Sequence, residues 1–443
     1  MTGNPDFHHS PPISPPKNRS IPFLIVVGLF GLGLGFLINI LDPFIYTEKV
    51  RLLAPPSLKN TALSLITIIT LIVALVTQPL IGRWSDRTRS RWGRRAPYLS
   101  GGVVSLSFSL VLLVVADNLW LLTGAAMLIA ASSNTVQGTW QAFIPDQVRE
   151  SQRGTAAGIK TLLEIIGVIT GVTLVGESLA RGNLWAAPLT AIGLFWGILL
   201  ITLSTMSQSA GQRGSESPLG DRLANQYQDE GLKNSPPLAK LLFIHSLIRA
   251  VPGFSWWMLN RFLFWSATIA IRTFSLNYME DVLSLTPAEA QVLNSRLFLI
   301  MGIGVFLLTL PAGALADRIG RQPLLLVAGL MAASGATFLI LVRNPDLLFI
   351  AVGLIGSGAG IFASTNWALA TDLAPKNQGA LYLGLANGAT VVGSIGGRLG
   401  GLLIDGLNQL GGTSTGYLVV FEIAVLFFIG SSVVVLKIPG KRP

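Results

Sequence analysis

The chain has 443 residues, of which 51% are hydrophobic and only 12% are charged, and its mean hydropathy is +0.61. Soluble domains carry about 25% charged residues, so this composition excludes an ordinary soluble protein and indicates a protein of the lipid bilayer. The absence of cysteine excludes disulfides, iron–sulfur clusters and thiol catalysis.

Residues 1–20 are rich in Pro, Ser and His and lack the apolar core of a signal peptide, so we predict a disordered cytoplasmic tail. After this tail come twelve apolar stretches that are long enough to cross a bilayer. The predicted membrane-spanning helices are 22–45, 60–81, 97–116, 119–143, 155–177, 186–206, 259–278, 293–315, 323–342, 347–370, 380–404 and 416–437. The seventh is unusual because it contains Arg261 and Arg272.

A polar stretch after the sixth predicted helix divides the chain into two sets of six. The fold class expected is therefore an all-α polytopic membrane protein with two six-helix bundles. The expected organisation is a tail over 1–20, a bundle over 21–206, a central cytoplasmic loop over 207–250, a second bundle over 251–437 and a cytoplasmic tail over 438–443.

The distribution of basic residues predicts the orientation in the membrane. With the N-terminus inside, 21 of the 31 Lys and Arg residues fall in inward segments and 6 in outward loops. This asymmetry follows the positive-inside rule, so we expect a multi-pass protein of the cytoplasmic membrane with both termini in the cytoplasm. The net charge of +10 then reflects topology, and no nucleic-acid partner is expected.

A short charged motif occurs twice. "GRWSDRTRSRWGRR" begins at Gly82 and "GALADRIGRQ" begins at Gly313, each between the second and third predicted helix of its half. A second pair, "WQAFIPDQVRESQRG" and "WALATDLAPKNQG", follows the fourth helix of each half. The first pair is offset by 231 residues and the second by 227, which indicates two homologous halves.

These motifs resemble the loop signature of major facilitator superfamily transporters. The form "SDRTRSRWGRRAPYL" is similar to that of the glycoside–pentoside–hexuronide:cation symporters and the related sucrose transporters. The resemblance implies the major facilitator fold, with two pseudo-symmetric halves that rock about a central site. It also implies a latch in which the motif aspartate faces the start of a helix in the other half.

Carried over to this chain, the latch places Asp86 against the start of the eleventh helix near Gly379, and Asp317 against the start of the fifth near Gly154. The arginines of the motif would brace it, or they anchor the topology by contact with lipid phosphates. The predicted latch residues are Asp86, Arg87, Arg94, Arg95, Asp317, Arg318 and Arg321.

Polar residues inside spans are costly and tend to face a cavity or a partner. The resemblance implies that helices 1, 4, 7 and 10 line the transport path, and amides with aromatic rings suit a neutral sugar. The predicted substrate-binding residues are Asn39, Asp42, Asn134, Gln137, Trp140, Gln141, Trp265, Arg272, Asn366 and Trp367. Each single amide could instead join helices together. Arg272 is expected to bind a substrate oxygen or a carboxylate such as Asp42, and Arg261 to extend to the inner surface.

Lys160 and Glu164 lie one helical turn apart on the fifth predicted helix and can form an ion pair. A carboxylate near the middle of a span is costly when charged, so Glu164, with Lys160, is the candidate coupling group, unless the two form a fixed structural pair. The second predicted helix contains no acidic residue. The paired aspartates of sodium-coupled melibiose permeases are thus missing there, which favours proton coupling, or uncoupled transport, over sodium coupling.

The function predicted from these patterns is transport of a sugar or glycoside across the membrane, by proton symport. The expected partners are a sugar-like small molecule, a proton or other monovalent cation and the lipid bilayer, with no cofactor and no metal. An exporter of drugs or other small amphipathic solutes is the alternative. An enzyme is disfavoured because the chain has no cysteine and only three histidines. A non-transporting sensor on the same fold would not need both Asp-Arg motifs.

Overall fold

The computed structural model describes residues 20–88, 90, 95–149, 152–210, 251, 253–375 and 379–438. The predicted N-terminal tail, most of the predicted central loop, nearly all of the C-terminal tail and Arg94 therefore lie outside the described residues. In the described part every regular element is helical.

Each predicted span corresponds to a helix. The first half contains α1 (Ile21–Ile40), η1 (Leu41–Tyr46), α2 (Thr47–Leu53), η2 (Pro56–Leu58), α3 (Lys59–Arg87), α4 (Ala96–Val115), α5 (Leu119–Gln147), α6 (Arg153–Ala180) and α7 (Ala186–Ala210). The second half contains α11 (Phe254–Asp281), α12 (Pro287–Ile319), α13 (Arg321–Leu341), η4 (Pro345–Leu347), α14 (Leu348–Leu373), α15 (Gly379–Arg398), α16 (Gly400–Gly411) and α17 (Thr415–Val435).

Ten helical runs in the described part are long and apolar enough to cross a membrane. The two other predicted spans are α11, which contains Arg261 and Arg272, and the pair α15–α16, which is interrupted at Leu399. Large apolar side chains such as Phe108, Leu310 and Leu426 are exposed on the outside of the molecule, as expected where lipid is the solvent. The chain is therefore a multi-pass membrane protein.

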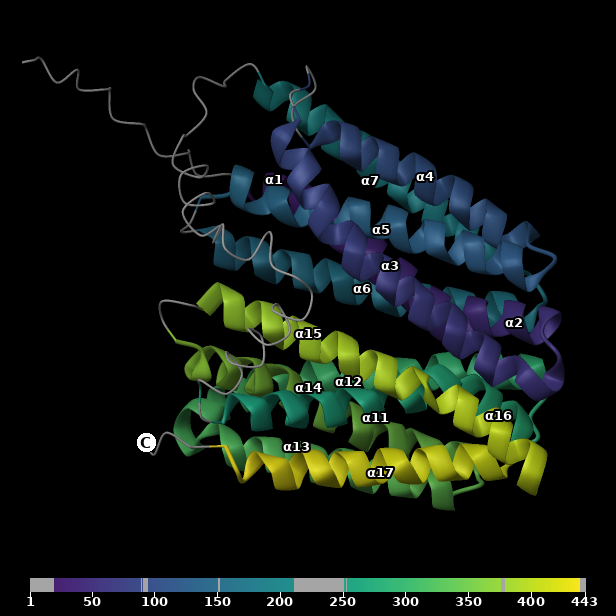
Figure 1. Ribbon diagram of the computed structural model, residues 1–443. Helices are drawn as coiled ribbons and strands as arrows, with labels where there is room; N and C mark the ends of the chain where they lie inside the picture. The colour runs from purple at the N-terminus through teal and green to yellow at the C-terminus, as the bar shows by residue number, and fades with distance from the viewer. Residues whose placement is uncertain are drawn as a thin grey trace, which may run out of the picture.

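The helices form two bundles, α1 to α7 and α11 to α17, which lie side by side (Figure 1). Glycines bring helices close together within each bundle, as is common in membrane proteins. A Cβ atom at Gly35 of α1 would overlap the Glu164 carbonyl of α6. A Cβ atom at Gly397 of α15 would likewise overlap the Ser266 carbonyl of α11. The first and fifth spans of both halves thus pack in the same way.

The first span is longer than predicted. It continues through the π-helix η1 and through α2 to Leu53. Pro43 in η1 lacks a backbone N–H donor, but the chain keeps its helical course there. Lys49 and Arg51, two of the six basic residues assigned above to outward loops, therefore lie in a helix, and their placement in a loop was wrong. Lys49 is buried, and its Nζ donates to the carbonyls of Val114 and Ala116 at 3.0 and 2.5 Å, at the end of α4.

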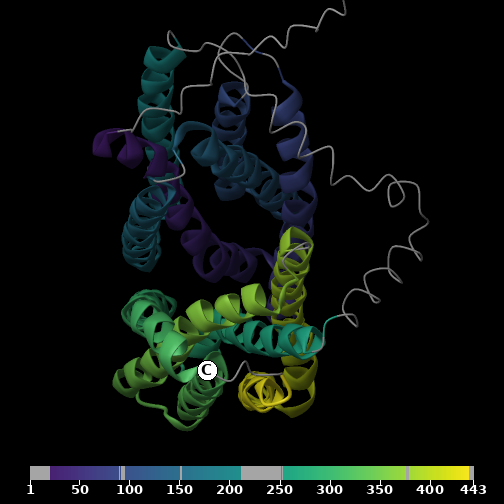
Figure 2. The ribbon, with the colours of Figure 1, turned by 90° about the vertical axis from the view of Figure 1, so that its left-hand side faces the viewer.

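The two ends of the bundles differ. We call the end where α1 begins and α17 finishes the proximal end, and the opposite end, with α2 and α16, the distal end (Figure 1). Figure 2 views the molecule from the proximal end and shows the two bundles one above the other. Among described residues, the cross-bundle hydrogen bonds and ion pairs lie in the middle and distal turns of the helices. The distal end is therefore where the halves are joined.

Candidate functional site: a charge layer between the bundles

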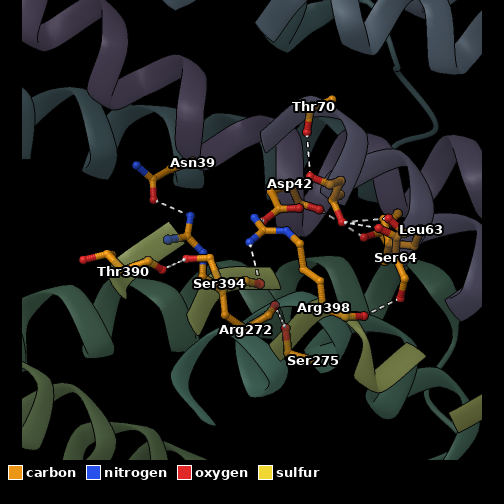
Figure 3. A network of polar contacts seen from close by, with 12 residues as sticks. Asn39, Asp42, Leu63, Ser64, Thr70, Arg272, Ser275, Thr390, Ser394 and Arg398 are labelled. Atoms are coloured by element: carbon orange, nitrogen blue, oxygen red, sulfur yellow. Dashed lines mark hydrogen bonds and ion pairs between the residues drawn. The ribbon is translucent and has the colours of Figure 1, made fainter. Parts of the chain in front are cut away.

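Four side chains from both halves meet midway along the molecule (Figure 3). Arg272 of α11 donates from Nη2 to Oδ1 of Asn39 at 2.9 Å. Arg398, the last residue of α15, donates from Nη2 to Oδ2 of Asp42 at 2.7 Å. We call Asn39, Asp42, Arg272 and Arg398 the charge layer. It brings together three predicted substrate-binding residues, but Asp42 pairs with Arg398 and not with Arg272 as expected.

Local backbone features position these groups. Asn39 donates its amide to the carbonyl of Gly35, one turn earlier in α1, which fixes the amide so that its oxygen faces Arg272. Asp42 lies in the π-helix η1, and such widened turns are common at functional sites. On the other side, the helix is interrupted directly after Arg398, and the Arg398 carbonyl accepts a hydrogen bond from Ser64 of α3 at 2.6 Å.

Arg398 was missed as a site residue. Its signal in the sequence is a basic residue inside a predicted span, the same signal that singled out Arg272. Both arginines are costly in a membrane unless they find a partner. The partner of Arg398 could not be read from spacing, because Asp42 lies 356 residues away in the chain.

The polar residues of α5 lie nearer the proximal end. Asn134 donates to the carbonyl of Ala130 in its own helix, Gln137 is half-buried, and the exposed Gln141 accepts a hydrogen bond from Gln78 of α3 at 3.3 Å. These contacts stay within the first bundle, and neither involves a residue of the charge layer.

Of the three tryptophans predicted to contact substrate, one is buried in the packing and two are partly accessible. Trp140 is only 2% exposed, and its indole nitrogen donates to the carbonyl of Val27 at 2.6 Å, so it is a packing residue in this structure and not an open platform for a sugar. Trp265 is partly buried, and its indole nitrogen has no hydrogen-bond partner among the described residues. Trp367 is 37% exposed.

Asn366 belongs to a buried network inside the second bundle. It is fully buried and links Asn260 to Arg261, whose Nη1 donates to its Oδ1 at 2.5 Å. The Arg261 guanidinium also lies between the rings of Trp257 and Trp367, about 5.5 Å from each. The expectation that Arg261 extends to the inner surface is therefore wrong, because partners within the bundle hold it, and Asn366 joins helices.

Lys160 and Glu164 of α6 form the expected pair, with Nζ and Oε2 3.6 Å apart. The Glu164 side chain is 44% exposed, so it is not enclosed in this structure. The Lys160 ammonium also lies 5.3 Å from the centre of the Trp140 ring. The geometry agrees with either interpretation of the pair, coupling group or fixed ion pair.

Polar contacts join the two bundles at the distal end. Asp405 of α16 is buried and accepts from the Asn60 side chain at 2.8 Å and from the backbone N–H of Thr61 at 2.6 Å. Lys59 forms an ion pair with Asp281 at 2.7 Å, and the Tyr417 hydroxyl donates to the same carboxylate. We call Lys59, Asn60, Thr61, Asp281, Asp405 and Tyr417 the distal seal. None of these six residues was predicted as a site residue from the sequence.

The comparison with protein families identifies the fold. The family model described as Major Facilitator Superfamily matches residues 23–397 and 258–443 of this chain. The chain belongs to the major facilitator superfamily. It is 25% identical over 262 residues to the sucrose transport protein SUC3 of Arabidopsis thaliana, and the matched region covers 49% of this chain and 43% of that protein. It is 31% identical over 113 residues to the multidrug resistance protein MdtH of Shigella dysenteriae, covering 26% and 27%.

The chain thus spans less than half the length of these curated relatives of the superfamily. Two solved structures share its fold over nearly the whole length. A nucleoside transporter NupG mutant superimposes with a TM-score of 0.70 and 14% identity over 93% of this chain and 98% of that one. A mutant of the peptide transporter POT gives a TM-score of 0.67 and 13% identity over 96% and 98%. The major facilitator fold predicted from the motifs is confirmed.

The superfamily motif residues lie at the proximal ends of α3 and α12. The side chains of Asp86 and Arg87 are outside the described part, but the backbone of both ends α3. Arg95 is buried and donates to the hydroxyl of Ser85 at 2.6 Å. In the second copy Asp317 is 71% exposed and lies 3.6 Å from Arg321, while Arg318 is exposed and Arg321 donates to Asp372 at 2.5 Å. Among the described residues, no hydrogen bond or ion pair joins Asp317 to α6.

Proposed function

We propose that this superfamily transporter moves a sugar or glycoside across the cytoplasmic membrane by alternating access, coupled to a proton. The observation that supports this is the arrangement of the distal seal beyond the charge layer. Contacts between the halves close one end of the path, while the charge layer lies at the interface where a solute can touch both halves.

Alternating access then requires the seal to open. The seal consists of hydrogen bonds and one ion pair, Lys59 with Asp281, and each such contact contributes about 0.5–1.5 kcal/mol. Interactions of this size break and form again on the timescale of a transport cycle. With the proximal end in the cytoplasm, as the basic residues predict, the distal seal closes the path on the outer side.

The proton is assigned to Glu164 with Lys160. The pair lies on α6, a helix that also packs against α12 of the other half near Gly176 and Ser295, so its surroundings change when the halves move. A carboxylate that is partly exposed in one state and enclosed in the other binds a proton more tightly when enclosed. This difference is the minimum needed for coupling.

The alternative is an exporter of drugs or other small amphipathic solutes. It is supported by the similarity to the multidrug resistance protein MdtH. The two functions predict opposite directions of net movement and different solutes.

Purified protein in liposomes with an imposed proton gradient distinguishes them. We expect gradient-driven accumulation of sucrose or another small glycoside on the side that protons enter. Gradient-driven movement of ethidium against the protons, without movement of any sugar, would establish the exporter in place of the symporter. The Asp86→Asn variant, reconstituted at equal density, is the control for movement through the protein.

A further inference from the structure

The charge layer has more positive than negative charge. The ionised groups that act on Arg272 within the described part of the chain are Asp42, which attracts it, and Arg398, which repels it. Two guanidinium groups therefore share one carboxylate, and one positive charge is left over. Uncompensated charge inside a membrane protein is costly, so the charge layer favours a negatively charged ligand.

The same side chains have unused hydrogen-bonding groups. Nε of Arg272, Nε of Arg398 and Oδ1 of Asp42 are buried and have no hydrogen-bond partner among the described residues. The other contacts of Arg272 are the amide oxygen of Asn39 and the ring of Phe298, 5.5 Å away, and neither carries a charge. A guanidinium has five N–H donors in a planar fork, so Arg272 keeps most of its donors for a ligand.

Among the described residues, no group of the second bundle accepts a hydrogen bond from Nε of Arg272 or Nε of Arg398. Arg398 donates from Nη1 to the carbonyl of Ser394 in its own helix at 3.3 Å, and its only charged partner in the described structure is Asp42, from the first bundle. An anion at this position would touch groups from both halves. It would therefore be sensitive to their relative movement, as a transported substrate must be.

We propose that the charge layer binds the carboxylate of a hydroxylated organic acid, held by Arg272 and Arg398. This inference rests on the proposed transport function and specifies its substrate class as anionic. A guanidinium binds a carboxylate through two parallel hydrogen bonds, and Asn39 can bind a neighbouring hydroxyl. Asp42 competes with the ligand for Arg398, so its negative charge weakens binding.

Binding to the purified full-length protein tests this independently of transport. The probe pair is gluconate and sorbitol, which share the same carbon chain and differ in a carboxylate against a hydroxymethyl group. We expect gluconate to raise the melting temperature at constant ionic strength and sorbitol to have no effect. Glucose 6-phosphate distinguishes a phosphate site from a carboxylate site.

Variants separate the roles of the charges. Arg272→Gln and Arg398→Gln should each weaken gluconate binding by about tenfold or more, whereas Asp42→Asn should tighten it. The Asp42 variant keeps the proposal testable if the arginine variants do not fold. The exposed Arg181→Gln is the matched control.

Three results would overturn the proposal: equal binding of gluconate and sorbitol, binding of glucose 6-phosphate alone, or weaker gluconate binding by Asp42→Asn. If the protein transports sucrose and binds no organic acid, the anionic substrate is wrong and the transporter stands. If it binds gluconate but moves no solute in liposomes, the proposed function fails and the binding site stands.

Discussion

The two ends of α3 offer the same kind of interaction to the other bundle. At the distal end, the first turn of α3 receives the carboxylate of Asp405 from α16, which accepts the Thr61 N–H. At the proximal end, α3 carries Asp86, which the superfamily resemblance directs toward the start of α15 near Gly379. On this expectation, an aspartate would meet a helix start of the other bundle at both ends of α3.

The distal exchange is made in this structure, whereas the proximal one is a prediction from the superfamily resemblance. A carboxylate at a helix start is worth about 0.3–2 kcal/mol, so the two exchanges are of similar strength. Two rigid bundles that rock cannot make both at once. We therefore expect Asp405 to hold the state that is closed at the distal end and Asp86 to hold the state that is closed at the proximal end.

Loss of the distal exchange should have the largest effect. Asp405→Asn removes a buried charge that accepts two hydrogen bonds, and we expect the open distal state to gain about tenfold in population, as 1.4 kcal/mol would give. Because the chain has no cysteine, Ser295→Cys is a clean reporter. Ser295 is buried against Gly176 of the other half, and its labelling by a membrane-impermeant maleimide should rise about tenfold. Unchanged labelling would show that Asp405 does not help to hold the distal seal closed.

Loss of the proximal exchange should act in the opposite direction. Asp86→Asn should reduce transport about tenfold or less, because the state closed at the proximal end loses its latch, while insertion and substrate binding remain. Labelling of Ser295→Cys should fall. The double variant Asp86→Asn with Asp405→Asn should return labelling toward the parent value. Wild-type uptake by Asp86→Asn at equal membrane abundance contradicts the latch.

Coupling of transport to the proton gradient should depend on Glu164, and not on Asp86 or Asp405. Glu164→Gln imitates the protonated form, so we expect it to retain solute exchange but to lose accumulation against a gradient. A fixed structural pair with Lys160 predicts poor expression instead, with partial rescue by Lys160→Met. Gradient-driven accumulation by Glu164→Gln would show that the proton binds elsewhere.

Asp317→Asn should have the smallest effect of the motif variants. In this structure Asp317 is 71% exposed, and Arg321 keeps Asp372 as a closer partner, so little is lost here. We expect transport to fall only about two- to threefold. Arg181→Gln, which disrupts an exposed pair with Glu177, is the control and should leave transport unchanged. A loss of transport as large as that caused by Asp86→Asn would show that the two copies of the motif contribute equally to transport.

The fold could be predicted from the sequence because lipid imposes a strong pattern. Runs of apolar residues must form helices, and the repeated Asp-Arg motif identified the superfamily. The boundaries at η1 and at Leu399 could not be predicted. A proline that only widens a helical turn and a short break between two glycine-rich helices have no sequence pattern that separates them from an ordinary helix or an ordinary loop. Both irregularities lie at the charge layer.

The site was predicted only in part, for a related reason. The cost of charge in a membrane singled out Asp42 and Arg272, but it does not say which residues meet. Asp405 and Asn60 lie 345 residues apart in the chain and near predicted span ends, where polar residues are common, so they carried no signal. Trp140 and Asn366 were attributed to substrate although they join helices, because polar groups in spans serve both purposes.

The central claim is that the bundles rock so that one end closes as the other opens. Two spin-label pairs in the cysteine-free chain test it by pulsed electron resonance: Leu58→Cys with Leu410→Cys at the distal end, and Thr155→Cys with Leu315→Cys at the proximal end. These are exposed positions in opposite bundles. The account predicts that Asp405→Asn lengthens the distal distance and shortens the proximal one. Distances that change in the same direction, or only at one end, would contradict it.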